Sequence, residues 1–239
     1  MPALSRLVAS VAIALALSPA APAQTPSQAA MFEKLSALAQ GGDAEAKYHL
    51  GMFLNNGIGT ARDNPAAYKL FTEAAAGHEL AAYKVGCYLA GQFPGVVPVN
   101  QAEALKFKLR AAEAGYALAQ QDVGVIYRKQ QDPQNATLWW ERASRQGEVQ
   151  ATALLAHHLS GDASPDLAKS YALMLVLKQL TPKPPQELLA QIAKVEPQLT
   201  ADDKAKAEAI RATWLTGKSP LTVQADTVMK RVQTLLASR

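Results

Sequence analysis

The residues that could carry chemistry are few, and their spacing favours no catalytic site. His157 and His158 are adjacent, and adjacent helix positions point about 100° apart, so the two imidazoles cannot easily bind one metal ion without other ligands. His78-Glu79 begins like a zinc-protease helix, but Ala82 stands where the second histidine would be. The sequence holds no Ser-x-x-Lys, Gly-x-Ser-x-Gly or Cys-x-x-Cys. We therefore expect no enzyme, metal or cofactor.

The beginning of the chain is typical of an export signal. Arg6 is the only charge before an apolar run over residues 7–17, and Ala21-Pro22-Ala23 has the small-x-small pattern of a cleavage site. The run is too short to span a bilayer, which needs about 20 residues. We expect residues 1–23 to be a signal peptide cut after Ala23, and the mature protein to be periplasmic or secreted.

Charge and hydropathy exclude two classes of partner. The formal net charge is +4, and the basic residues are scattered instead of gathered in a run that could neutralise phosphates. Beyond the signal no apolar stretch is long enough for a membrane helix. We expect no nucleic-acid partner and no stable membrane span.

Four segments of the sequence repeat, and this repeat predicts the fold. Each opens with a glycine and reaches an aliphatic–small pair at the same offset. The opening glycines are Gly42, Gly77, Gly115 and Gly147, and the pairs are Leu50-Gly51, Val85-Gly86, Val123-Gly124 and Leu155-Ala156. The pattern predicts a helix pair per repeat, with the small residue of the first helix placed where a neighbouring helix comes close.

The second helix of each pair has its own signals. Asn64-Pro65, Asp132-Pro133 and Ser164-Pro165 each place a cap residue before a first-turn proline, and Asn100 with Glu103 resembles a capping box. An alanine followed three positions later by a large residue recurs in these helices, as in Ala67 with Leu70, Ala104 with Phe107, Ala136 with Trp139 and Ala168 with Tyr171.

Two residue types in these helices allow a structural and a functional interpretation. The chain has one cysteine, Cys87, and on an apolar helix we expect a small buried hydrophobe more than a reactive thiol. Trp139 and Trp140 could stack on sugar rings. At helical spacing, however, Trp139 is expected in the core and Trp140 at a contact between repeats.

These segments resemble the Sel-1-like repeat. The resemblance rests on Ala44–Gly51, on Asn56-Gly57-Ile58-Gly59 and on the spacing after Ala67, and it covers about residues 42–180. It implies an all-α fold, a right-handed superhelical solenoid of antiparallel helix pairs with about four repeats and capping helices, used for protein–protein contact. The chain departs from the family pattern in an expanded second loop at Phe93–Pro98 and in a third loop without the Asn-Gly-x-Gly turn.

The flanking segments are expected to close the array, because an end repeat would otherwise leave its apolar face in water. We expect an N-terminal capping helix within residues 24–41, repeats over 42–180, a C-terminal capping hairpin over 181–215 with Thr200 capping its second helix, and a linker with an amphipathic helix over 216–239. The apolar stripe of that last helix consists of Leu221, Ala225, Val228, Val232 and Leu235. Docking back onto the repeats is favoured over binding another molecule.

The resemblance also implies a concave groove lined by the first helices of the pairs. Carried over by alignment, the partner-binding positions are Tyr48, Met52, Asn55, Tyr83, Cys87, Gln121, Val125, Arg128 and His157. Whether Tyr48 and Tyr83 face the groove or pack between repeats stays open. The sequence favours an exported, non-catalytic scaffold for a partner protein or peptide. The alternatives are a periplasmic cell-wall glycan-binding protein and a hydrolase with a site assembled across repeats.

Overall fold

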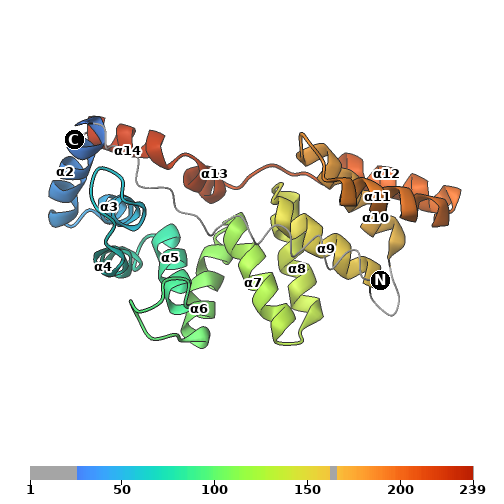
Figure 1. Cartoon of the computed structure of the whole chain (residues 1–239), viewed down its shortest axis with the longest axis horizontal. Coiled ribbons are helices and arrows are strands. Elements are labelled where there is room, and N and C mark those ends of the chain that lie inside the picture. The colour runs from blue at the N-terminus through green and yellow to red at the C-terminus, as the bar shows by residue number, and fades with distance from the viewer. Residues whose placement is uncertain (1–25, 162–165, 239) are drawn as a thin grey trace. The chain divides into compact units, whose positions relative to one another are not determined.

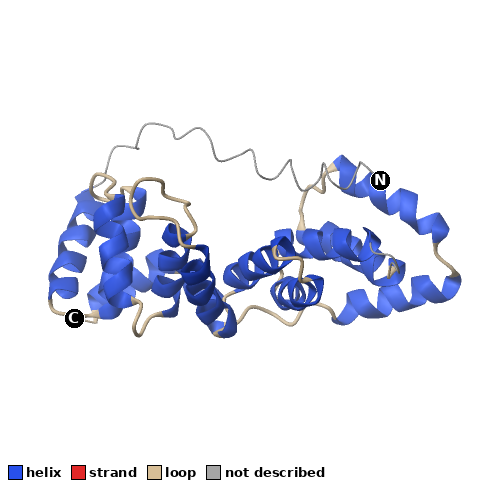
Figure 2. Ribbon diagram, turned by 90° about the horizontal axis from the view of Figure 1, so that it is seen from below, coloured by secondary structure: helices blue, strands red, loops and turns tan. Residues whose placement is uncertain are grey.

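The computed structural model describes residues 26–161 and 166–238, which form helices joined by loops, with no strand among them (Figure 1, Figure 2). In chain order the helices are α2 (Pro26–Gln40), α3 (Ala44–Asn56), α4 (Asn64–Ala74), α5 (Glu79–Leu89), α6 (Gln101–Glu113), α7 (Ala117–Lys129), α8 (Pro133–Arg145), α9 (Val149–Gly161), α10 (Leu167–Leu180), α11 (Gln186–Val195), a 3-10 turn (Glu196–Gln198), α12 (Ala201–Thr213), α13 (Pro220–Asp226) and α14 (Val228–Ala237). The all-α prediction is confirmed. The expected signal peptide and the Ser164-Pro165 cap lie outside the described residues.

The described chain divides into two compact units. The first unit comprises residues 26–119 and 219–238, and the second comprises 120–161 and 166–218. The chain leaves the first unit within α7 and returns to it at Ser219. Helices α13 and α14 therefore belong with the first repeats, although they follow α12 in the sequence.

The helices pack as the predicted pairs. We call α3, α5, α7 and α9 the A helices and α4, α6, α8 and α10 the B helices. Within the units α3 packs on α4, α5 on α6 and α9 on α10, and α4 and α8 each pack on the A helix that follows. The capping helix α2 packs on α3 and lies within residues 24–41.

The small residue of each A helix lies where its B helix crosses, as predicted. A Cβ added at Gly51 would lie 2.7 Å from the ring of Phe71 in α4. A Cβ at Gly124 would fall well inside contact distance of the Trp140 indole in α8. Since neither ring has room to retreat into solvent, glycine at these positions sets the spacing of the helix pair.

The B-helix ring that faces the glycine is one position beyond the large residue of the alanine spacing seen in the sequence. Phe71 and Trp140 stand four positions after the buried alanines Ala67 and Ala136, not three, because residues i and i+4 share a helix face. Trp139 is also buried, with the Arg142 guanidinium 4.6 Å from its ring centroid. Both tryptophans are therefore packed inside the second unit instead of offering a ring face to a sugar.

Capping follows the sequence with one correction. Asp132 accepts a hydrogen bond from Asn135 N (3.0 Å) and Asn100 accepts one from Glu103 N (3.1 Å), so both predicted caps are confirmed. Helix α4 is capped by Asp63, whose Oδ1 accepts from Ala66 N at 2.9 Å, and the predicted cap Asn64 is its first residue. The prediction was one residue late because the first four N–H groups of a helix lack partners, so proline fits the second position as well as the first.

The second unit is closed by α11 and α12, which pack on α10. Thr200 caps α12 as predicted, in a capping box with Asp203. At the end of this helix Trp214 Nε1 donates to Ser144 Oγ (2.8 Å), and the Arg145 guanidinium lies 4.3 Å from the ring centroid of Trp214. The closing helices are thereby tied to α8.

The C-terminal amphipathic helix docks back, as favoured, but it is two helices instead of one. The break is at Thr227, with φ −113° and ψ 27°. Leu221 and Ala225 of α13 pack on the apolar cluster of repeats 1 and 2, whereas Val232 of α14 enters a second cluster formed by α2 and α3. The break allows the two halves of one predicted stripe to meet two separate apolar clusters.

Candidate partner-binding surface

In the first unit, the predicted groove residues on α3 are mostly packed inside the protein. Tyr48 is buried, and its ring stacks on the His78 ring with centroids 4.4 Å apart. Burial raises the pKa of the Tyr48 hydroxyl. Asn55 Oδ1 accepts a hydrogen bond from the Tyr88 hydroxyl of α5 at 2.7 Å, while Met52 is half-buried. Tyr48 and Asn55 therefore join neighbouring repeats in this structure.

The two predicted groove residues on α5 are buried as well. The Tyr83 ring meets the Tyr116 ring edge-on at 5.0 Å, and Lys108 Nζ lies 5.7 Å from the Tyr83 ring centroid. Cys87 is buried in the same helix, as expected for a small hydrophobe. The open question about Tyr48 and Tyr83 thus has an answer, since both pack between helices of the first unit.

In the second unit, three of the four predicted positions are at least partly exposed: Val125, Arg128 and His157. Gln121 is buried and donates from Nε2 to Gln150 Oε1 at 3.2 Å. Val125 is half-buried, and Arg128 is exposed one turn later on α7. His157 on α9 is half-buried, and its pKa is lowered by burial, by His158 and by the nearby charge of Arg128. We call Val125, Arg128 and His157 the α7–α9 surface.

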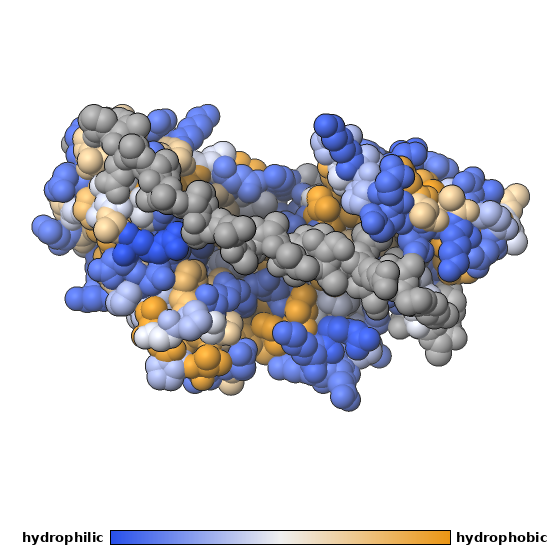
Figure 3. All heavy atoms as spheres, viewed as in Figure 1, coloured by the Kyte–Doolittle hydropathy of each residue, from blue (hydrophilic) through white to orange (hydrophobic). Residues whose placement is uncertain are grey.

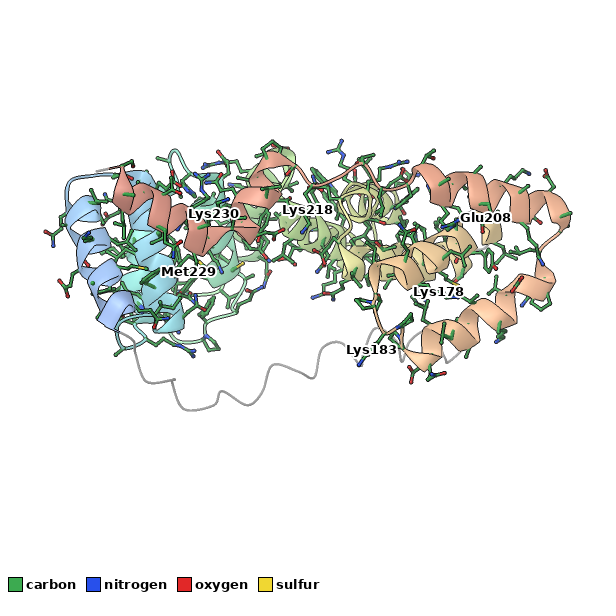
Figure 4. The ribbon with its side chains drawn as sticks, turned by 90° about the horizontal axis from the view of Figure 1, so that it is seen from above. Lys178, Lys183, Glu208, Lys218, Met229 and Lys230 are labelled. Atoms are coloured by element: carbon green, nitrogen blue, oxygen red, sulfur yellow. The ribbon has the colours of Figure 1, made fainter. Side chains whose placement is uncertain are left out.

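Residues 219–237, which we call the C-terminal segment, meet the first turns of α3 and α7. Figure 4 labels Met229 and Lys230 within this segment. Ser219 Oγ donates to the Gly115 carbonyl at 2.8 Å, and Thr222 Oγ1 accepts from Ala117 N at 3.0 Å. Ala117 is the first residue of α7, so Thr222 binds a helix N–H that has no intrahelical partner. Gly115 has φ +97°, and a Cβ there would lie 3.1 Å from Ser219 Cβ.

Helix α14 completes this contact on α2 and α3, beside which it lies in Figure 1. Val232 is 0% exposed in a cluster with Leu35 and Phe53. Next to it, Arg231 Nε donates to Glu45 Oε1 at 3.0 Å. The C-terminal segment is therefore held by hydroxyl contacts at one end and by an apolar anchor with an ion pair at the other.

Two buried histidines lie beside this ion pair. His49 Nε2 is 3.5 Å from Glu45 Oε1, which is long for a hydrogen bond, and the ring is fully buried. Burial lowers the pKa of His49 to about 4 despite the opposing charge of Glu45. His78 caps α5 by accepting from Ala81 N at 3.2 Å, and burial lowers its pKa too. Burial therefore favours the neutral form of both imidazoles.

Comparison with known proteins identifies the repeat. The family model of the Sel1 repeat matches residues 44–78, 80–116 and 117–148. The chain contains three Sel1 repeats. The predicted fourth repeat, α9 with α10, follows the matched residues and packs as a helix pair like those before it.

One solved structure shares this fold, and two others match with lower TM-scores. A Sel1 repeat protein from Oxalobacter formigenes is 20% identical with a TM-score of 0.56, covering 88% of this chain and 79% of that one. A protective antigen of uropathogenic Escherichia coli with an SLR fold is 18% identical (TM-score 0.31, 87% of this chain, 59% of that one). An immunity protein from Pseudomonas aeruginosa is 17% identical (TM-score 0.36, 86% of each chain). Comparison with curated proteins gives no match.

Clusters of metal-ligating side chains and membrane-spanning helices are both absent from the described part of the chain. Among residues 26–161 and 166–238, no three His, Cys, Asp or Glu side chains are grouped as metal ligands. No helix in the same ranges has the length and apolar character needed to cross a membrane. On the face drawn in Figure 3, hydrophilic side chains predominate and apolar ones form separate patches.

Sequence analysis missed the residues that hold the C-terminal segment: Glu45, Ser219, Thr222 and Arg231. Glu45 and Arg231 are 186 positions apart, so no local spacing could pair them. One signal was available, since Arg231 flanks the apolar stripe of a helix expected to dock. A docked stripe predicts an acidic residue somewhere on the receiving surface, without saying which one.

Proposed function

We propose that this Sel1 repeat protein is an exported, non-catalytic scaffold that binds a partner protein or peptide on the A-helix side of its repeats. Sel1 repeats commonly serve as protein-interaction scaffolds. The observation that carries the proposal is the α7–α9 surface, where exposed Arg128 lies beside half-buried Val125 and His157.

The chemistry of this surface suits a partner with acidic side chains. The Arg128 guanidinium can bind a carboxylate through two parallel hydrogen bonds, and arginine often dominates the energy of an interface. Val125 adds apolar contact one turn away. The predicted groove residues of the first unit, by contrast, include no exposed side chain, so the proposal places first contact on α7 and α9.

An in-cell crosslinking pull-down tests this assignment. The native chain is compared with Val125→Asp/Arg128→Glu, and Lys183→Glu serves as a control because Lys183 is exposed in the loop before α11 (Figure 4). We expect one protein to be captured by the native chain and the control and lost with the double variant. Circular dichroism must show equal helix content in all three. Capture that survives the double variant would exclude the α7–α9 surface.

Export is proposed from the sequence of residues 1–23 alone. If the signal is cleaved after Ala23, the mature chain begins at Gln24. Mass spectrometry of the protein from the periplasmic fraction and the culture medium would show that N-terminus. A chain that keeps Met1 in the cytoplasm would contradict this part of the proposal.

A further inference from the structure

The C-terminal segment is bound to the first unit as a separate ligand would be. It is preceded by the exposed residues 215–218 and contacts residues more than 100 positions earlier in the sequence. Its two helices have 7 and 10 residues, and isolated helices of that length are marginal in water. Its helical form therefore depends on the surface on which it lies.

The docked segment keeps one of its own faces open to solvent. An open depression of about 460 Å³ remains beside the ion pair of Glu45 and Arg231, lined also by Val223, Thr227, Lys230 and Leu235. Thr227, where the helix is broken, lines this depression. Val223 is 46% exposed and Met229 is 38% exposed, so apolar side chains of the segment also face solvent. The docked segment therefore buries only part of its own apolar surface.

The receiving surface has the features of a helix-binding site. It offers an apolar pocket around Leu35 and Phe53, the carboxylate of Glu45, and the first N–H of α7 at Ala117. These three features are matched in the segment by Val232, Arg231 and Thr222. A helix that fits this surface is amphipathic, with a hydroxyl near its start and an arginine beside its apolar stripe. Binding of an amphipathic helix in an apolar groove is a common mode of recognition.

We propose that this surface of the first unit, formed by α2, α3 and the start of α7, binds an amphipathic, arginine-bearing helix of the partner, and that the C-terminal segment covers the surface until that helix displaces it. The inference rests on the proposed scaffold function and names the class of partner. The C-terminal segment competes from within the same chain. The apparent affinity for a helix from another molecule therefore equals the intrinsic affinity multiplied by the fraction of protein whose surface is uncovered.

The test uses the full mature chain and a fluorescent synthetic peptide of residues 219–238, whose fit to the surface is known. The variant Val232→Asp places a charge in the apolar pocket and weakens the docking of the C-terminal segment. Fluorescence anisotropy should show the native peptide binding to this variant about tenfold or more tightly than to the native chain. Equal affinity for both chains would overturn the proposal.

A charge exchange makes the test specific. A peptide carrying Arg231→Glu should bind the Val232→Asp chain weakly, and should regain affinity when the chain also carries Glu45→Arg. Binding that ignores these reversals would overturn the proposed site. A milder chain variant, Ser219→Ala/Thr222→Val, should show the same order of affinities if Val232→Asp fails to fold.

Two controls separate this inference from the scaffold function. Hydrogen exchange must confirm that α2 to α5 stay protected when the segment is released, because loss of their protection would make the segment an integral part of the fold and overturn the proposal. Light scattering must show a monomer, since dimerisation of the weakened chain would assign the surface to a second copy instead. Neither assay uses Arg128, so the pull-down result on the α7–α9 surface can succeed or fail independently.

Discussion

The two compact units are built from the same repeat, but they differ in the A-helix positions that a partner would meet. In the first unit Tyr48, Asn55, Tyr83 and Cys87 are buried, and the C-terminal segment lies on the first turns of α3 and α7. In the second unit Arg128 is exposed at an equivalent position. A repeat position therefore does not determine exposure, which depends on the residue type and on the segments that close each unit.

The two units also close their apolar ends differently. The second unit uses α11 and α12, which follow it directly in the sequence, and ties Trp214 to Ser144. The first unit uses α2, which precedes it, and α14, which arrives from the other end of the chain. The proposed displacement requires that closure by this terminal segment be reversible without unfolding of the repeats.

The largest expected effect comes from the glycine that sets helix spacing in the second unit. Gly124→Ala forces the Trp140 indole to move, so we expect a loss of about 3 kcal/mol in the free energy of unfolding. All three tryptophans lie in the second unit, so urea unfolding followed by tryptophan fluorescence reports on that unit. Gly51→Ala in the first unit should shift the circular dichroism transition and leave the fluorescence transition in place.

Gly77→Ala is the matched control for this comparison. An added Cβ at Gly77 meets nothing within 4 Å, so we expect a change within about 0.5 kcal/mol. If Gly51→Ala moved the fluorescence transition as far as Gly124→Ala does, the two units would unfold together and the comparison would fail.

Acidification should weaken the first unit through His49. Its folded pKa of about 4 lies below the unfolded value of 6.5, so the unfolded state binds more protons between these values. The stability contributed by neutral His49 is complete above about pH 6.5 and is lost as the pH falls to about 4, a loss of roughly 2–3 kcal/mol. Urea unfolding at pH 7, 5.5 and 4.5, followed by circular dichroism, measures it.

The variant His49→Phe keeps an aromatic ring of similar size and removes the titration. Its unfolding free energy should depend less on pH over this range than that of the native chain. An identical pH dependence in both chains would show that His49 does not carry the effect, leaving His78 as the next group to replace, by asparagine to preserve its capping of α5.

Removing the apolar anchor of α14 has a smaller effect. Val232→Ala deletes methyl groups from a fully buried site, which we expect to reduce the stability of the docked segment by about 2 kcal/mol. Val223→Ala is the control, because that side chain is largely exposed on the same segment. Hydrogen exchange over residues 219–237 should rise in Val232→Ala and stay near native in Val223→Ala, and equal rates would contradict the assigned anchor.

Local patterns predicted most of the fold because local interactions generate it. The spacing around Gly51 and Gly124 identified the helix pairs, Asp132 and Thr200 identified helix starts, and the stripe through Val232 identified a docking helix. In each case the physical cause lies within one helix or one helix pair, where sequence spacing and spatial spacing correspond.

The candidate site was less predictable because burial is set by contacts between distant segments. Nothing in the spacing of Tyr48 tells whether His78 will cover its ring, and nothing near Arg231 identifies Glu45 as its partner. The break at Thr227 was missed for the same reason, since a single stripe does not reveal that its halves meet two clusters.

The smallest expected effect is that of the ion pair between Arg231 and Glu45. The two side chains are 37% and 31% exposed, so solvent screens them and we expect a coupling of about 0.5–1 kcal/mol. A double-mutant cycle with Arg231→Gln and Glu45→Gln, read by unfolding of the first unit, measures that coupling. The pair Lys206 and Asp202 in the second unit, 61% and 74% exposed, should give a coupling near zero.

Salt should distinguish these two pairs further. At 1 M salt the screening length is about 3 Å, so the coupling between Arg231 and Glu45 should fall toward that of Lys206 and Asp202. A coupling that is absent even at low salt would mean that Val232 and the hydroxyl contacts alone hold the segment. The arginine of a competing helix would then add no affinity over a neutral residue. In the charge-exchange experiment its effect would appear only as the difference in affinity between the native peptide and the Arg231→Glu peptide.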